Sequence, residues 1–190
     1  VNIEHLELVR PSELTSNGRV LSGGLTIYRH NEIGLSNIKI FEPKGEDGLN
    51  IKYADSCSIS HLNIRNPFSD GLDIDKCPTN LKHLKIEADK DFAFGNDGLD
   101  FSLASFNVKD AIISGFSDKG ISVGEASKVV LDRISLKRNN IGIAVKDSSC
   151  LVGRDLSFKN NAQQVSVYNK KQHFASGKAY FDKITDKMFA

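Results

Sequence analysis

Tryptophan is absent from the 190 residues, and proline and methionine occur only four times and once. The chain also lacks an excess charge of either sign, with 25 Lys and Arg against 24 Asp and Glu, which argues against a nucleic-acid partner. No apolar run approaches the roughly 18 residues of a membrane-spanning helix, so we expect no membrane insertion. What remains is a chain long enough to bury the core of one domain.

Cysteine is scarce as well. The count of three is odd and no pair has the C-x-x-C spacing of a metal site, so the cysteines do not indicate a disulfide framework. Cys57 and Cys150 occupy positions in an apolar pattern, and free cysteine is among the most buried residue types. The sequence therefore predicts buried thiols at these two positions.

The chain does contain a repeated short motif that starts with glycine. In each copy apolar and polar residues alternate, which predicts a strand with one buried face. Successive copies begin 22 to 27 residues apart. The copies are GLTIY (24–28), GLNIK (48–52), GLDID (71–75), GLDFS (98–102), GISVG (120–124) and GIAVK (142–146), and QVSVY (164–168) continues the series with glutamine.

A second pattern follows each copy: two alternating apolar residues, two polar residues, and two more alternating apolar residues. Cys57, Ile59, Leu62 and Ile64 form one example. Because the polar pair interrupts the alternation, the strand must turn a corner there. The corner position is held by residues that we expect to point outward rather than to bind a metal: His5, Asn37, His61, His83, Asp110, Arg133 and Asp155.

A repeat of about 22 residues built from short strands and corners is typical of a parallel β-helix. A leucine-rich repeat has a similar length, but its Leu/Asn consensus and helical half are missing, and the one candidate helix is a short segment near residues 12–14. We therefore predict an all-β fold, a parallel β-helix of about seven coils that forms a single domain over residues 1–190.

Stacked coils lie about 4.8 Å apart, so equivalent residues form ladders along the axis. Two ladders should point inward and carry the core. The first contains Leu25, Leu49, Leu72, Leu99, Ile121, Ile143 and Val165, and the second contains Ile27, Ile51, Ile74, Phe101, Val123, Val145 and Val167.

The two ends depart from the repeat. VNIEHLEL (1–8) matches the second half of a coil, so we expect a fragment of a longer solenoid with other domains in the parent chain. At the other end, AYFDKITDKMFA (179–190) breaks the repeat, and we expect residues 183–190 to form a short C-terminal cap.

Acidic residues recur at outward positions, although strands normally contain few of them. Asp73 and Asp75 lie two residues apart on one face, and Asp100 follows Asp73 one coil further on. Carboxylates stacked this closely repel, so one should hold its proton more tightly or a cation should lie between them. A third set of acids precedes the strands and could instead bond nearby backbone amides as turn residues: Asp47, Asp70, Asp97 and Asp118.

Both outcomes are useful on a sugar polymer. Two carboxylates can supply the acid and base of glycoside hydrolysis, whereas calcium held by Asp oxygens could neutralise a uronate carboxylate while a lysine acts as base. Our candidate catalytic residues are Asp73, Asp75, Asp100, Lys119 and Lys146. The candidate calcium ligands are Asp70, Asp73, Asp97 and Asp100.

Charged and aromatic residues extend the same face. They could form the edge of a substrate groove, or a plain salt-bridge network between coils. The candidate substrate-binding residues are Lys52, Tyr28, Glu125, Asp147, Tyr168, Lys170 and Lys171.

Several segments, in their order along the chain, resemble right-handed parallel β-helix repeat proteins of the pectate-lyase-like superfamily. They are SDGLDID (69–75), NDGLDFS (96–102), SDKGISVGE (117–125), GIAVKD (142–147) and NKKQHF (169–174). In particular they resemble the bacterial group found beside spore-coat CotH-like and lamin-tail domains, and the resemblance covers roughly residues 20–182. It implies a right-handed helix, an association with an envelope or exported polysaccharide, and hence an extracellular or cell-envelope location.

The wider superfamily includes pectate lyases, polygalacturonases, alginate epimerases and phage tailspikes, so the resemblance does not fix a reaction. The chain lacks the Asn-Thr-Asp, Gly-His-Gly and Arg-Ile-Lys motifs of the polygalacturonases, and SDGLDID is a loose counterpart of their paired-Asp segment. Two hypotheses follow. The protein is either a lyase, epimerase or hydrolase acting on an extended, acidic polysaccharide, or a non-catalytic glycan-binding or structural module of a larger envelope protein.

Overall fold

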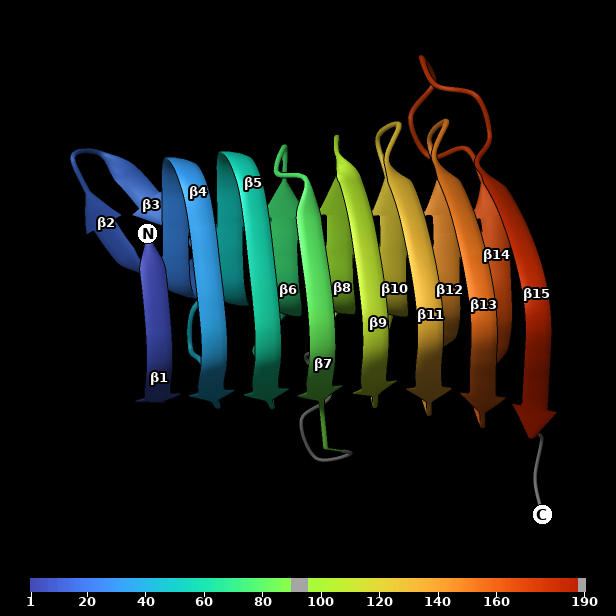
Figure 1. Ribbon diagram of the computed structural model, residues 1–190, viewed down its shortest axis with the longest axis horizontal. Coiled ribbons are helices and arrows are strands. Elements are labelled where there is room, and N and C mark those ends of the chain that lie inside the picture. Colours follow the sequence, from blue (N-terminus) through green and yellow to red (C-terminus); the bar gives the residue numbers. More distant parts are fainter. Residues whose placement is uncertain (90–95, 188–190) are drawn as a thin grey trace.

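The computed structural model describes residues 1–89 and 96–187, and the regular secondary structure of these residues consists of β-strands (Figure 1). The described residues contain no helix that could span a membrane. The strands are β1 (Asn2–Val9), β2 (Leu14–Ser16), β3 (Arg19–Leu21), β4 (Gly23–Phe41), β5 (Asp47–Arg65), β6 (Asp70–Asp75), β7 (Thr79–Glu87), β8 (Asp97–Ser102), β9 (Ser105–Ser114), β10 (Lys119–Gly124), β11 (Lys128–Lys137), β12 (Ile141–Lys146), β13 (Cys150–Lys159), β14 (Gln163–Tyr168) and β15 (Lys178–Lys187).

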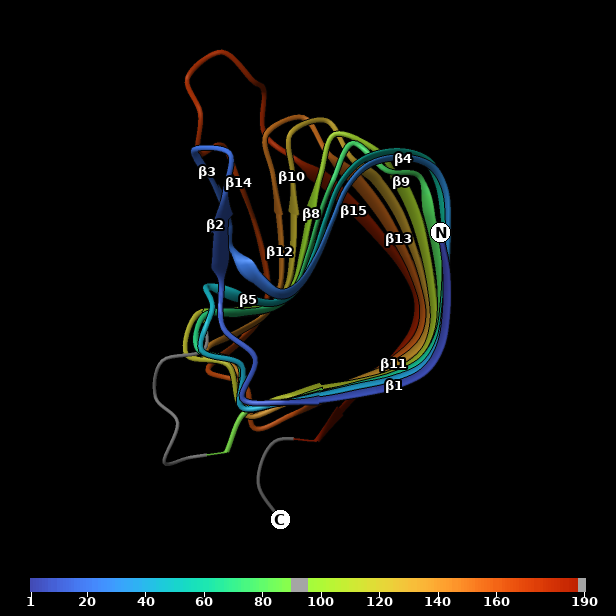
Figure 2. The same ribbon diagram turned by 90° about the vertical axis from the view of Figure 1, so that its left-hand side faces the viewer.

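The strands stack in parallel as two rows that share the long strands β4 and β5. One row runs β4, β5, β6, β8, β10, β12, β14, and the other runs β1, β4, β5, β7, β9, β11, β13, β15. Figure 2 shows the coils superimposed around one enclosed core. The first row supplies seven stacked segments among the described residues, so the predicted parallel β-helix of about seven coils is confirmed.

The register of the predicted inward ladders is confirmed, and their members are buried except at the end rungs, where Leu25 and Val165 are partly buried and Val167 is exposed. Leu72 pairs with Leu49 on one side and with Leu99 on the other, and all three side chains are fully buried. Phe101 of the second ladder pairs with Ile74 and Val123 and stacks on Phe106, with ring centroids 4.3 Å apart. Burial decreases at the last rung, where Val167 is 44% exposed.

The predicted corner is also confirmed, and its cause is visible in the backbone. The seven residues assigned to it all have left-handed φ angles between 51° and 58°. The same corner recurs at Lys183 in β15. His61 and His83 stack there, with ring centroids 4.8 Å apart, and both are exposed on the outside of the helix.

Glycine recurs at the start of the GLDID-type strands because neighbouring backbone leaves no room for a side chain. A Cβ at Gly71 would lie 2.5 Å from Ile86 Cγ2 and 2.6 Å from the carbonyl oxygen of Gly98. Since Gly98 begins the next copy of the motif, each glycine lets the following coil approach closely.

The expected C-terminal cap at residues 183–190 was wrong for residues 183–187, the part that the structure describes. Residues 178–187 form β15, which pairs in parallel with β13 over its whole length, with Ile184 beside Leu156. The segment therefore adds a layer to the sheet instead of folding over its end, because its apolar residues continue the corner pattern. Residues 188–190 of the expected cap lie outside the described residues.

The expected short helix near residues 12–14 was also wrong. Leu14–Ser16 and Arg19–Leu21 pair as an antiparallel hairpin around Asn17 and Gly18. Both turn residues have positive φ, 50° and 71°, as the type I′ hairpin turn requires. The dipeptide Asn-Gly was the available sequence signal.

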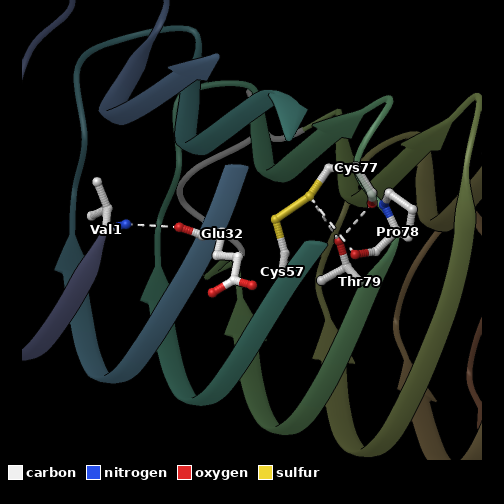
Figure 3. Close-up of a disulfide and its surroundings, with 6 residues drawn as sticks. All are labelled: Val1, Glu32, Cys57, Cys77, Pro78 and Thr79. Atoms are coloured by element: carbon white, nitrogen blue, oxygen red, sulfur yellow. Dashed lines mark hydrogen bonds between the residues drawn. A yellow bond between two sulfur atoms is a disulfide. The ribbon is translucent and has the colours of Figure 1, made fainter. Parts of the chain in front are cut away.

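The cysteine expectation needs correction too. Cys57 is buried, but it forms a disulfide with Cys77 instead of remaining a thiol (Figure 3). Cys57 pairs with Thr79 across adjacent coils, so Cys77, two residues earlier, comes within bonding reach. Thr79 Oγ1 holds this turn by donating to the Cys77 carbonyl at 2.7 Å. Cys150 is a free thiol but only half-buried.

Candidate functional site

The candidate residues gather on the outward side of β4, β5, β6, β8, β10, β12 and β14 and in the turns that follow these strands. We call this surface the Asp/Lys face. Its two outward rows follow the predicted register: Asp73 lies between Asn50 and Asp100, and Asp75 lies between Lys52 and Ser102.

Lys52 joins the two central carboxylates. Its Nζ lies 3.2 Å from Asp73 Oδ2 and 3.0 Å from Asp75 Oδ2. The side chain of Asp73 is 15% exposed, against 29% for Asp75, so Asp73 is the deeper group. One ammonium group thus serves two carboxylates, which leaves this part of the face short of positive charge.

The environment of Asp73 favours its protonated form. Burial and then the nearby carboxylates Asp75 and Asp47 raise its pKa to about 8, although Lys52 opposes the shift. Asn50 Nδ2 donates to Asp73 Oδ2 at 2.8 Å and to Asp47 Oδ2 at 2.7 Å, which links the acids of successive coils. The pKa of Asp47 is raised to about 6, again mainly by burial. The expectation that one stacked acid holds its proton more tightly agrees with this geometry.

Asp100 completes the central group. It pairs in register with Asp73 on one side and Ser122 on the other. Its Oδ1 is buried and has no hydrogen-bond partner within the part of the chain that the structure describes. A buried acceptor without a partner costs stability.

The turn acids Asp70 and Asp97 behave as the simpler hypothesis predicts. Asp70 Oδ1 accepts from the backbone amide of Asp97 at 3.0 Å, and Asp97 Oδ1 accepts from that of Lys119 at 3.1 Å. Burial and then Asp97 raise the pKa of Asp70 to about 7. Asp118 does not continue this ladder: Lys119 is in register with Asp97, because SDKGISVG has one residue more before its glycine. Asp118 instead bonds Lys119 Nζ.

Lys119 and Lys146 are both buried, at 6% and 7% exposure, and face polar partners on the helix itself. Lys119 Nζ contacts both oxygens of Asp97, at 3.0 and 3.3 Å. Lys146 Nζ donates to Ser122 Oγ at 2.7 Å. Its stem crosses Gly124, where an added Cβ would lie 2.9 Å from Lys146 Cε. The β10–β12 part of the face is therefore covered. It separates the partly exposed strands β4, β5, β6 and β8 from the partly exposed β14.

Another group of candidates fastens the loop after β14. Asp147, which is fully buried, accepts from the backbone amides of Lys170 and Lys171, both at 2.8 Å. Glu125 bonds the Lys171 ammonium group. Tyr168 pairs in register with Lys146, and burial raises its pKa. These residues hold segments together at one end of the face, as the salt-bridge alternative predicts.

At the opposite end of the face, the sequence analysis named Tyr28 and Lys52 but missed the hairpin and Arg19. The β2–β3 hairpin overhangs a pocket of about 340 Å³, lined by Arg19 and Leu21 from the hairpin and by Tyr28, Asn50 and Lys52 from the face. The guanidinium of Arg19 lies 5.6 Å from the Tyr28 ring centroid. Since the hairpin was not recognised, its Arg19 could not be placed beside Tyr28 and Lys52.

The described residues contain no group of three or more His, Cys, Asp or Glu side chains arranged to hold a metal ion. Of the candidate calcium ligands, Asp73 and Asp100 are register neighbours, as expected. Asp70 and Asp97 already accept backbone amides, and Asp97 also holds Lys119. Asp73 and Asp100 are thus the pair through which a cation could act.

The family model that describes a right-handed β-helix region matches residues 47–186, well over half of the chain. The match begins at β5 and extends into β15, so it covers Asp73, Asp75, Asp100 and the covered lysines. Comparison with curated proteins and with solved structures gives no match. The register, the corners and this match agree: the chain belongs to the right-handed β-helix family.

Proposed function

We propose that the protein is a carbohydrate-active β-helix that binds an extended, acidic polysaccharide on the exposed part of the Asp/Lys face and acts on it at Asp73, Asp75 and Asp100. One observation carries this proposal: three carboxylates lie within two adjacent coils, and a single half-buried ammonium group, that of Lys52, serves two of them. A scaffold needs no such arrangement, because like charges in register destabilise a sheet.

The residues divide into two chemical roles. Asp73, with a pKa of about 8, carries a proton at neutral pH and can donate it to the oxygen of a glycosidic bond. Asp75, more exposed and held by Lys52 at 3.0 Å, supplies the base or nucleophile. Asp100, one coil away and in register with Asp73, places a third carboxylate beside the reacting pair. A neutral Asp73 also lowers the repulsion that an acidic sugar meets here.

Hydrolysis fits these residues better than elimination does. A lyase or epimerase needs a base near the sugar ring and a cation that neutralises the uronate carboxylate. Lys119 and Lys146 are buried and already bonded to Asp97 and Ser122. These two lysines are therefore poorly placed to act as the base. The cation that elimination also needs would have to be calcium held between Asp73 and Asp100.

A non-catalytic glycan-binding or structural module is the second candidate. The bonds of Asp147 and Glu125 to the loop after β14, and of Lys119 to Asp97, favour it, because these charged groups already hold the protein to itself. Under this alternative the exposed part of the face binds a glycan without changing it.

The test combines binding with product release. Polygalacturonate, alginate and a neutral glucan are incubated with the wild type, with Asp73→Asn, Asp75→Asn and Asp100→Asn, and with Asp110→Asn as a control on the opposite corner. We expect new reducing ends from an acidic polymer, and a loss of about 10²-fold or more in the first two variants. Binding should change little in these variants, and Asp110→Asn should match the wild type.

Two results would decide against the proposal. Binding without any product would establish the non-catalytic module. Absence of binding to every polymer would remove the glycan proposal itself.

A further inference from the structure

The Asp/Lys face is closed at the end nearest the N terminus. The β2–β3 hairpin projects there from the chain between β1 and β4 and lies on the outer side of the strands that form the face (Figures 1 and 2). Its turn is fixed by Asn17 and Gly18 in left-handed conformations. A polymer lying along the exposed strands therefore meets the hairpin instead of continuing past β4.

The pocket beneath the hairpin is small, and its positive charge comes from Arg19. Lys52 also lines the pocket, but its ammonium group is already bonded to Asp73 and Asp75. Asn50 and Tyr28 supply polar and aromatic surface, and no described residue that lines the pocket is acidic. Its volume of about 340 Å³ is at the low end of the range for ligand sites. It can hold one sugar unit with its substituents more readily than a segment of a chain.

The ring of Tyr28 is held in place by two arginines and a second tyrosine. The guanidinium groups of Arg19 and Arg29 lie 5.6 and 5.2 Å from its ring centroid. Tyr53 meets it edge to face, with centroids 5.6 Å apart. Cation–π contacts of this kind fix Arg19 on the wall of the pocket, where its remaining N–H groups can form a bidentate pair with a carboxylate.

The pocket is continuous with the central acids. Lys52 lines it and also bonds Asp73 and Asp75, and Asn50 lines it and donates to Asp73. A unit in the pocket therefore has its link to the next unit close to Asp73. In the other direction, the β10–β12 part of the face is covered.

We infer that this pocket receives the terminal, negatively charged sugar unit of a polysaccharide, so that the site recognises chain ends and Arg19 pairs with the carboxylate of that unit. The inference rests on the proposed function and adds an end-specific mode and a charge requirement to it.

The test uses oligogalacturonides of two to eight units, the same oligosaccharides with their carboxyl groups reduced to alcohols, and long polygalacturonate. Titration calorimetry is carried out on the wild type, on Arg19→Gln, and on Arg133→Gln, which removes an exposed arginine from a remote corner. We expect Arg19→Gln to weaken binding of the acidic oligosaccharides at least tenfold and of the reduced ones less than twofold. Arg133→Gln should match the wild type, and binding per gram of polymer should fall as chain length rises.

Each contrary result has its own meaning. If the wild type binds acidic oligosaccharides and Asp73→Asn or Asp100→Asn alters binding or turnover while Arg19→Gln does not, the proposed function stands and the pocket inference is overturned. If binding per gram is independent of chain length, end recognition is overturned. If the wild type binds none of these probes, the inference is overturned, and if it also fails to bind alginate, the proposed function is overturned with it.

Discussion

Lys119 Nζ lies 3.0 Å from Asp97 Oδ1 at a depth where their side chains are only 8% and 7% exposed. The pair joins β10 to β8, and the backbone amide of Lys119 bonds the same carboxylate. Burial alone would lower the pKa of Lys119, but its bonds to Asp118 and Asp97 outweigh it and raise that pKa. The lysine is therefore held as an ammonium ion inside the stack, which makes it a structural cation between coils.

Replacing Lys119 with methionine should destabilise the protein by about 3 kcal/mol, because Asp97 would remain buried without its counter-ion. Urea unfolding at pH 7 measures the change. Lys128→Met on β11, where the lysine is exposed, should stay within about 0.5 kcal/mol of the wild type. The double variant Asp97→Asn/Lys119→Met should recover part of the loss. Wild-type stability in Lys119→Met would show that the pair contributes nothing.

The Cys57–Cys77 disulfide closes a loop with a sequence separation of 20 residues. In the chain-entropy model a loop of this size stabilises the native state by about 3 kcal/mol. We expect Cys77→Ser, and wild type treated with reductant, to unfold at correspondingly lower urea concentration, while Cys150→Ser stays close to the wild type. Three free thiols per chain in the oxidised, denatured protein would contradict the assignment.

The inward ladders and the corner could be predicted because they depend on local periodicity that recurs in every coil. The inward position of Leu72 and the corner position of His61 can be predicted from their neighbours in sequence and a repeat of about 22 residues. The burial of Lys119 could not be predicted in this way, since an outward register position says nothing about what covers it. Lys146 shows the same limit. It folds across Gly124 to reach Ser122, which belongs to the other outward row of side chains on the neighbouring strand.

The disulfide and the pocket were missed for different reasons. Cys77 lies in a turn, outside the alternating pattern, so its distance from Cys57 depends on the path of the turn between β6 and β7. Arg19 belongs to the hairpin, which interrupts the repeat, and its place over Tyr28 follows from how that hairpin folds back. The Asn-Gly dipeptide at 17–18 predicts a hairpin but not its direction.

Gly71→Ala should destabilise the fold by about 1–3 kcal/mol, because the new methyl group would overlap Ile86 and the Gly98 carbonyl. Gly34→Ala is the matched control: there the nearest atom is Asn2 Oδ1, at the end of a side chain that can rotate away. Thermal unfolding followed by circular dichroism compares the two. Equal midpoints would show that close approach is not why the motif begins with glycine.

Calcium separates the two forms of the proposed chemistry. If calcium binds between Asp73 and Asp100, it stabilises the native state by about 2.7 kcal/mol at a concentration 100 times its Kd. Thermal unfolding in EDTA and in millimolar calcium should then differ for the wild type and agree for Asp73→Asn/Asp100→Asn. A wild type that does not respond, together with a more stable double variant, would favour an acid/base pair without a metal.

Asp73 also makes a prediction about pH. Its pKa is raised from 3.8 in the unfolded chain to about 8 in the folded protein, first by burial and then by the carboxylates of Asp75 and Asp47. Between these values the native state binds more protons than the unfolded state, so the free energy of unfolding falls as pH rises, by at most about 1.4 kcal/mol per pH unit for one group. Asp70, with a pKa of about 7, contributes in the same direction but is largely ionised above pH 7. We therefore expect urea unfolding to show a decrease in stability between pH 7 and 8 that Asp73→Asn reduces.

Asp110→Asn should keep the wild-type slope there, because Arg133 lowers the pKa of Asp110 and its effect is confined to acid. An unchanged slope in Asp73→Asn would mean that Asp73 is already ionised at neutral pH, and the proton donor would have to be another residue.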